Sequence, residues 1–137
     1  MTPTSLPRRL WLWAPPLAYM GLIFHLSSES NPLPVLTQNI WDKALHFVEY
    51  GGLGFLLCRA IIGEGSALNV AALAAAILTS LYGASDEWHQ LFTPGRSSDV
   101  YDWFSDTIGG GLGVGAYVFI VAFLLNMASR RPRPLQR

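Results

Sequence analysis

Four long hydrophobic runs divide the sequence and leave little of it for any other kind of structure. They cover about residues 10–27, 44–62, 67–85 and 104–127, and each is close to the roughly 20 residues that a helix needs to cross a bilayer. Backbone polar groups find no water in lipid, so single segments of this kind cross as helices. We therefore predict an all-α, polytopic membrane protein that forms a four-transmembrane-helix bundle.

Charged residues are few and lie mostly at the ends of these runs. They make up 13% of the chain and their net charge is zero, whereas a soluble domain carries about twice that share. The balance predicts no nucleic-acid partner, and the length allows one domain over residues 1–137. Residues 128–137, rich in Arg and Pro, are predicted to form a flexible basic tail on anionic membrane lipids.

The positions of lysine and arginine predict an orientation, because cytoplasmic loops carry an excess of both. Four spans place seven basic residues on one side of the membrane and only Lys43 and Arg96 on the other. Both termini are therefore expected in the cytoplasm, and the polar clusters described next are expected on the extracytoplasmic side. The seven are Arg8, Arg9, Arg59, Arg130, Arg131, Arg133 and Arg137.

Polar and ionisable residues gather at three helix ends, and helical spacing puts part of each group on one face. These parts are Asp42 and His46 with either Glu49 or Tyr50, Asp86 with His89 or Gln90, and Asp99 with Asp102 and Asp106. Such groups are unfavourable near hydrocarbon unless they are paired or face a wet cavity, which makes them candidates for function. They are Asp42, Lys43, His46, Glu49 and Tyr50 at the second run, Asp86, Glu87, His89, Gln90 and Arg96 after the third, and Asp99, Asp102 and Asp106 at the fourth.

Three kinds of chemistry fit this set, and the residues alone leave all three open. In an acid–base site, His46, Asp86 and Glu87 would be the catalytic candidates, and the other members except Asp99 would bind a substrate. Arg96 would then hold a phosphate or carboxylate through its planar guanidinium group. A divalent metal could instead bind His46 and His89 with nearby carboxylates. The chain has no compact metal-binding spacing, so we predict no cofactor.

The third possibility is a structural network without a ligand. Arg96 would pair with Asp99, Asp102 or Glu87, and aspartates at a helix start are favoured by the local positive dipole. His25, near the same end of the first run, could join a site or simply be solvated. The Gly-xxx-Gly spacings within residues 109–115 predict close helix packing inside the bundle, or contact with a second copy or another membrane protein.

Three motifs follow one another at these helix ends. They read Asp42-Lys43-x-x-His46-x-x-x-Tyr50-x-x-Leu53, Ser85-Asp86-Glu87-x-x-Gln90-x-Phe92-x-Pro94-Gly95-Arg96 and Asp102-x-x-x-Asp106-x-x-Gly109. In this order they resemble the VanZ-like family of small bacterial integral membrane proteins. The resemblance implies a multi-pass protein of the bacterial cytoplasmic (inner) membrane with a role at the cell envelope. The founding member of that family is associated with resistance to the glycopeptide teicoplanin.

The leading hypothesis is an envelope protein whose extracytoplasmic polar site binds a lipid-linked or peptidoglycan-related molecule, such as a cell-wall precursor. Binding and chemical modification both stay open, as does an effect on teicoplanin susceptibility. The alternative is a non-catalytic membrane partner or scaffold whose polar cluster is a structural network. A transporter is disfavoured because the chain is too short for the usual inverted repeats.

Overall fold

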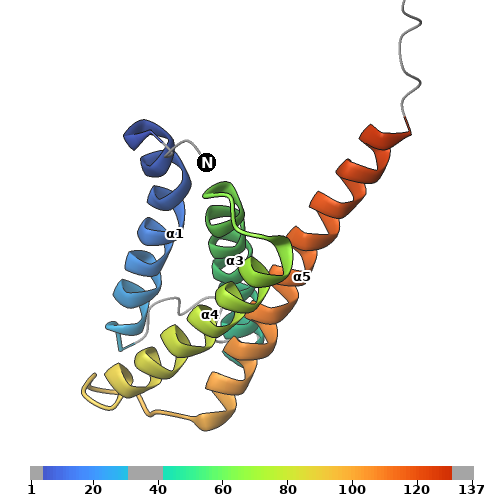
Figure 1. The fold of residues 1–137 in the computed structure, drawn as a ribbon. Helices are drawn as coiled ribbons and strands as arrows, with labels where there is room; N and C mark the ends of the chain where they lie inside the picture. Colours follow the sequence, from blue (N-terminus) through green and yellow to red (C-terminus); the bar gives the residue numbers. More distant parts are fainter. Residues whose placement is uncertain (1–4, 31–41, 131–137) are drawn as a thin grey trace, which may run out of the picture.

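The computed structural model consists of long helices joined by short connections (Figure 1). It describes residues 5–30 and 42–130, and this part of the chain contains helices and turns but no strand. The predicted all-α class and four-helix bundle are confirmed. The helices are α1 (Leu6–Ser27), α3 (Asp42–Gly63), α4 (Leu68–Gln90) and α5 (Val100–Ser129).

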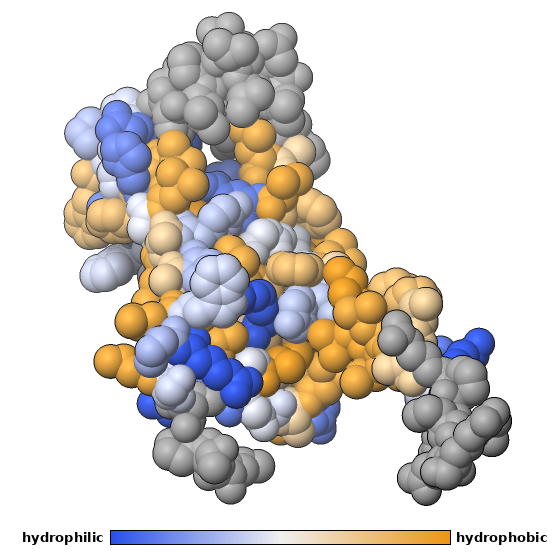
Figure 2. Space-filling model, turned by 90° about the horizontal axis from the view of Figure 1, so that it is seen from above, coloured by the Kyte–Doolittle hydropathy of each residue, from blue (hydrophilic) through white to orange (hydrophobic). Residues whose placement is uncertain are grey.

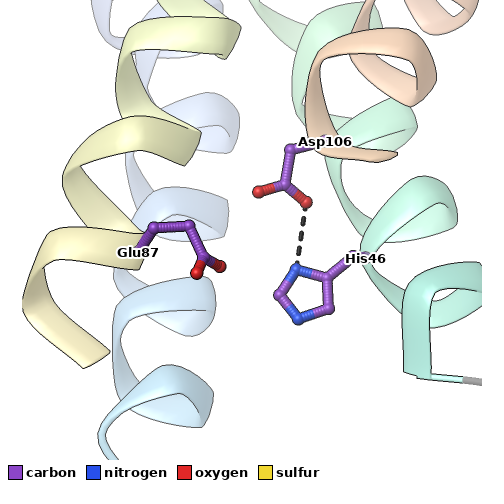
Figure 3. A group of neighbouring side chains, drawn as sticks. All are labelled: His46, Glu87 and Asp106. Atoms are coloured by element: carbon purple, nitrogen blue, oxygen red, sulfur yellow. Dashed lines mark hydrogen bonds and ion pairs between the residues drawn. The ribbon is translucent and has the colours of Figure 1, made fainter. Parts of the chain in front are cut away.

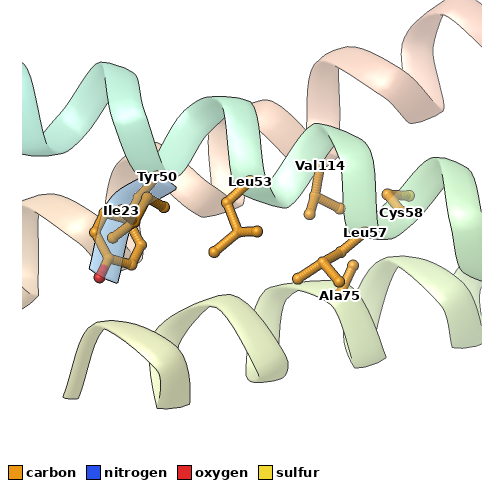
Figure 4. Packing of buried hydrophobic residues seen from close by; sticks show 7 residues of the cluster. All are labelled: Ile23, Tyr50, Leu53, Leu57, Cys58, Ala75 and Val114. Carbon is orange, nitrogen blue, oxygen red and sulfur yellow. The ribbon is translucent and has the colours of Figure 1, made fainter. Parts of the chain in front are cut away.

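Helix α3 is the centre of the bundle and contacts the other three helices, α5 most extensively. The buried core draws side chains from all four helices (Figure 4): Ile23 from α1, Ala75 from α4, Val114 from α5 and a row of residues from α3. Lipid tails are as apolar as these side chains, so close packing holds such a core together more than the hydrophobic effect does.

Three of the described helices are long and apolar enough to cross a membrane. These segments are Lys43–Gly63, Leu68–Gln90 and Val100–Ser129, and large hydrophobic side chains such as Phe119 and Leu125 are exposed on α5, as expected of a lipid-facing helix. The chain is therefore a multi-pass membrane protein. Helix α1 fits the bundle but is less clearly a span, because arginines, prolines and a histidine dilute its apolar residues.

The helices extend past the hydrophobic runs that predicted them. Helix α4 continues to Gln90 and α5 already begins at Val100, since helical hydrogen bonding persists beyond the apolar boundary. Helix α5 runs through Ser129 and so takes in the start of the segment predicted as a tail. Residues 131–137 of that tail, and residues 31–41 between the first two predicted runs, lie outside the described residues.

Helix α1 starts before its two central prolines and runs through them. Pro7 lies in its first turn, where a missing N–H does no harm. Pro16 has no N–H for the carbonyl of Leu12, four residues earlier. The guanidinium group of Arg59 on α3 donates a long hydrogen bond of 3.5 Å to that carbonyl. The carbonyl of Leu12, which Pro16 leaves without its usual helical donor, therefore forms a contact between α1 and α3.

The basic end of the bundle is held by a second set of polar contacts. Arg9 lies 3.3 Å from a carboxylate oxygen of Glu64, and the Trp13 indole donates to the same carboxylate at 3.1 Å. Arg8 donates to the carbonyl of Gly63 at 3.0 Å. Seen down this end, hydrophilic residues gather near the middle and hydrophobic residues dominate toward the end of α5 (Figure 2).

Glycines let α3 and α5 pack backbone against backbone. A Cβ at Gly109 would collide with the carbonyl of Phe47, and one at Gly113 with the carbonyl of Gly51. A Cβ at Gly111 or Gly115 would meet no described atom within 4 Å. One Gly-xxx-Gly pair therefore serves packing inside the bundle, as its spacing predicts. This close approach brings the polar starts of α3 and α5 together.

Candidate functional site

A histidine and two carboxylates from three helices meet at the end of the bundle opposite the basic residues. His46 lies one turn into α3, Glu87 lies in the last turn of α4, and Asp106 lies in the second turn of α5. Their side chains point toward one another (Figure 3), and all three residues are at most 8% exposed. We call these three residues the inner cluster.

Within the inner cluster, His46 and Asp106 form a direct pair. Nδ1 of His46 lies 3.0 Å from Oδ1 of Asp106. Glu87 is fixed from the other side, because its Oε2 accepts a hydrogen bond of 2.7 Å from the backbone N–H of Asp99. Ligand atoms of the three residues all lie within 4.8 Å of one another, so these are the residues that could hold a metal.

An ion-pair network lies beside the inner cluster and joins α3 to α5. The Lys43 ammonium group donates to Asp102 at 2.6 Å and to Asp99 at 2.7 Å. Asp99 caps α5 by accepting from the backbone N–H of Tyr101 at 2.8 Å. The Lys43 contact, together with that N–H, holds the pKa of the exposed Asp99 carboxyl below its usual value.

Tyr50 closes the inner cluster on the core side. It is fully buried, and its ring stacks on that of His46 with centroids 6.5 Å apart. The ring centroid of Tyr82 on α4 lies 6.3 Å from that of Tyr50, and its hydroxyl donates to the carbonyl of Met20 at 2.7 Å. Glu49 precedes Tyr50 on α3 and is partly buried.

Two other predicted residues of α4, Asp86 and His89, border a space between α4 and α1. Asp86 is 5% exposed and accepts from Gln90 at 3.3 Å. His89 lies 3.0 Å from the hydroxyl of Ser28, and its ring is 4.5 Å from that of Phe24. Asp86 and His89 both line a cavity of about 290 Å³.

That cavity is one end of a longer cleft between α1 and α4, which we call the α1–α4 cleft. A second cavity of about 390 Å³ shares Tyr82 and Ser85 with the first and is otherwise lined by apolar side chains and an indole. Those side chains are Trp13, Leu17, Met20, Leu57, Leu78 and Leu81. The residues of the first cavity besides the two that are shared are Phe24, Asp86, Trp88, His89 and Phe92.

Arg96 makes a contact that the sequence did not indicate. It donates to the backbone carbonyls of Glu29 at 3.0 Å and Leu26 at 3.4 Å, and so ties the α4–α5 loop to the end of α1. In the network hypothesis it was expected to pair with Asp99, Asp102 or Glu87, but Lys43 takes the first two. Its role as a holder of phosphate stays a prediction.

The predicted residues thus separate into two neighbouring groups at the end of α4. His46, Glu87 and Asp106 meet inside the bundle, whereas Asp86 and His89 face the α1–α4 cleft. Asp42 starts α3, and its side chain lies outside the described part. The sequence reasoning missed Phe24 and Tyr82 as cleft residues, and His25 is simply exposed.

This fold and these sites define a small multi-pass helical membrane protein with an acid–histidine cluster buried at one end of its bundle. The sequence matches the VanZ/LLP1 family over residues 8–125. The chain belongs to this family, which confirms the resemblance carried by its three motifs. No curated protein and no solved structure matches the chain.

Proposed function

We propose that this protein binds a lipid-linked molecule of the cell envelope, with the hydrocarbon chain in the α1–α4 cleft and the headgroup at its polar end. The observation that carries the proposal is the change from an apolar to a polar lining along the cleft. Leucines and Met20 line one stretch, and Asp86 and His89 line the other. An amphiphile with one long apolar part and one polar part has the same gradient.

The position of the cleft favours a ligand that arrives through the membrane. Leu17 and Leu81 line it and are 59% and 61% exposed, so the cleft opens toward lipid along much of its length. A chain lying there would exchange contacts with lipid tails for contacts with the protein. Affinity would then come from shape and from the headgroup, since removal from water contributes little inside a bilayer.

The chemistry at the polar end favours a headgroup rich in hydrogen-bond donors. The carboxylate of Asp86 accepts hydrogen bonds, and the His89 ring can donate or accept. The hydroxyl, amide and amino groups of a sugar–peptide headgroup would meet both needs. This supports a peptidoglycan-related precursor over a simple phospholipid.

The predicted orientation is part of the same proposal. With the basic residues in the cytoplasm, the polar end of the cleft would lie on the extracytoplasmic side of the inner membrane, where cell-wall precursors are used. Membership of the VanZ/LLP1 family supports an envelope role. Binding there would change how a glycopeptide such as teicoplanin reaches its target.

A photoreactive polyprenyl probe carrying a sugar–peptide headgroup tests the proposal in lipid nanodiscs. After irradiation, mass spectrometry should locate the crosslinks on residues that line the α1–α4 cleft. Leu81→Trp should remove most of the labelling, because the indole would fill the cleft. Leu73→Trp is the matched control, since Leu73 lies on the same helix with a similar exposure of 64% and does not line the cleft.

Two results would contradict the proposal. Labelling spread evenly over lipid-facing residues would indicate ordinary solvation by lipid, and equal labelling by a probe with a phosphocholine headgroup would remove the headgroup selectivity. In cells, Asp86→Asn and His89→Ala should shift any change in teicoplanin susceptibility that the wild-type protein causes, while Leu73→Trp should not.

A further inference from the structure

The inner cluster has two buried carboxylate oxygens without a hydrogen-bond partner among the described residues. These are Oε1 of Glu87 and Oδ2 of Asp106, and the two residues are 6% and 0% exposed. A buried acceptor left unsatisfied is destabilising, and more so when it is charged. Such groups in a native protein usually mark a bound water or ion.

The charges around the inner cluster point to a cation. Glu87 and Asp106 are two buried acids, and Lys43, the one lysine in the sequence, already holds Asp99 and Asp102. Arg96 donates to backbone carbonyls. One divalent cation would balance both carboxylates while His46 stays neutral, and buried charges are stable when they are balanced in this way.

The donor set selects the kind of cation. Mg²⁺ and Ca²⁺ take oxygen ligands, whereas an imidazole nitrogen is typical of zinc and its neighbours among the transition metals. We propose that His46, Glu87 and Asp106 form a binding site for one divalent transition-metal ion of the zinc class. Three protein ligands leave a fourth position for water or for a ligand group, as in catalytic zinc sites.

The ligand atoms of the inner cluster need to move only a little to surround one such ion. Bonds of about 2.0–2.2 Å place neighbouring ligands of a tetrahedral ion roughly 3.4 Å apart, and the three ligand atoms already lie within 4.8 Å of one another. The His46–Asp106 pair is at 3.0 Å, a separation that two ligands on one ion can also have. Binding would displace the proton that joins this pair, and Glu87 would have to move toward it (Figure 3).

Tag-free protein in detergent, stripped with a chelator and then titrated with Zn²⁺ or Co²⁺, tests the site. We expect saturable binding of about one ion per chain and a Co²⁺ absorption spectrum typical of nitrogen and oxygen ligands. Glu87→Gln, Asp106→Asn and His46→Ala should each lower the affinity at least about tenfold. Asp86→Asn is the matched control, because Asp86 is the neighbouring buried acid on α4 and faces the cleft.

Thermal unfolding gives a second measurement that does not depend on the variants folding well. An ion that binds only the folded chain raises the unfolding midpoint as its free concentration rises above the dissociation constant, so Zn²⁺ should raise the midpoint for the wild type and for Asp86→Asn. Wild-type protein with a normal helical spectrum and no saturable metal binding would overturn the proposal. So would equal losses in Glu87→Gln and Asp86→Asn.

The metal site and the proposed lipid binding can fail separately. Leu81→Trp should abolish labelling by the lipid probe and leave Zn²⁺ binding intact. Glu87→Gln should lower the affinity for Zn²⁺ at least about tenfold, whether or not the cleft binds a lipid.

Discussion

The ammonium group of Lys43 lies 2.6 Å from a carboxylate oxygen of Asp102, so the first turn of α3 is joined to the first turn of α5. Asp102 has a side chain only 9% exposed, and that of Lys43 is 22% exposed. The pair is therefore intermediate between a surface ion pair, which contributes little, and a buried one, whose disruption leaves a costly unpaired charge.

Lys43→Ala should destabilise the bundle because it leaves Asp102 partly buried without its cation. We expect a loss of about 1–3 kcal/mol, seen as a lower midpoint in thermal unfolding followed by circular dichroism in detergent. Lys43→Ala combined with Asp102→Asn should recover part of the loss. An unchanged midpoint for Lys43→Ala would show that the pair contributes nothing to stability.

The lowered pKa of Asp99 predicts that part of the protein's stability is lost in acid. Its pKa in the folded protein is lowered by Lys43 and by the Tyr101 N–H, so its contribution is complete above the ordinary pKa of an aspartate, about 3.9. It is lost as the pH falls through the lower folded-state value. Asp99→Asn should flatten the fall in unfolding midpoint below about pH 4 while it keeps the helix cap, since asparagine caps equally well. The same acid fall in both proteins would contradict this assignment.

Gly109 and Gly111 offer a matched test of the α3–α5 contact. Gly109→Ala should destabilise by about 1–3 kcal/mol, because the added Cβ would collide with the carbonyl of Phe47. Gly111→Ala faces open space and should be neutral or stabilising by up to about 1 kcal/mol, since alanine favours helix. Thermal unfolding in detergent measures both, and a similar loss in the two variants would show that the contact is not specific.

The sequence predicts the helices of this fold well and their exact ends poorly. Long apolar runs leave helix as the only stable choice in lipid, so α3, α4 and α5 follow from composition. Helix ends depend on hydrogen bonds that hydrophobicity does not measure, which is why α5 starts at Val100, before the apolar run that predicts it. Helix α1 is harder to assign as a membrane span, because its length is sufficient but its apolar content is diluted.

The candidate site shows a similar limit. Helical spacing predicts which residues share a face, but it does not say how each helix is rotated or which neighbour that face meets. Asp86 and Glu87 are adjacent in sequence, and only the rotation of α4 directs Glu87 to His46 and Asp86 to the cleft. The Lys43 contacts cross more than fifty residues of sequence and depend on the register between α3 and α5, which glycine packing sets.

Cysteine labelling would test both the orientation and the crossing of α1. The native Cys58 is fully buried, so a membrane-impermeant maleimide should label the wild-type protein little in intact cells. Ser97→Cys lies in the exposed α4–α5 loop and should be labelled from outside. Ser5→Cys and Ser129→Cys, at exposed ends of α1 and α5, should be labelled only after the membrane is broken.

Labelling of Ser129→Cys from outside would contradict the predicted orientation. The arginine-rich segments would then face away from the cytoplasm, against the charge asymmetry on which the orientation rests. Labelling of Ser5→Cys alone from outside would instead leave the orientation intact and show that α1 does not cross.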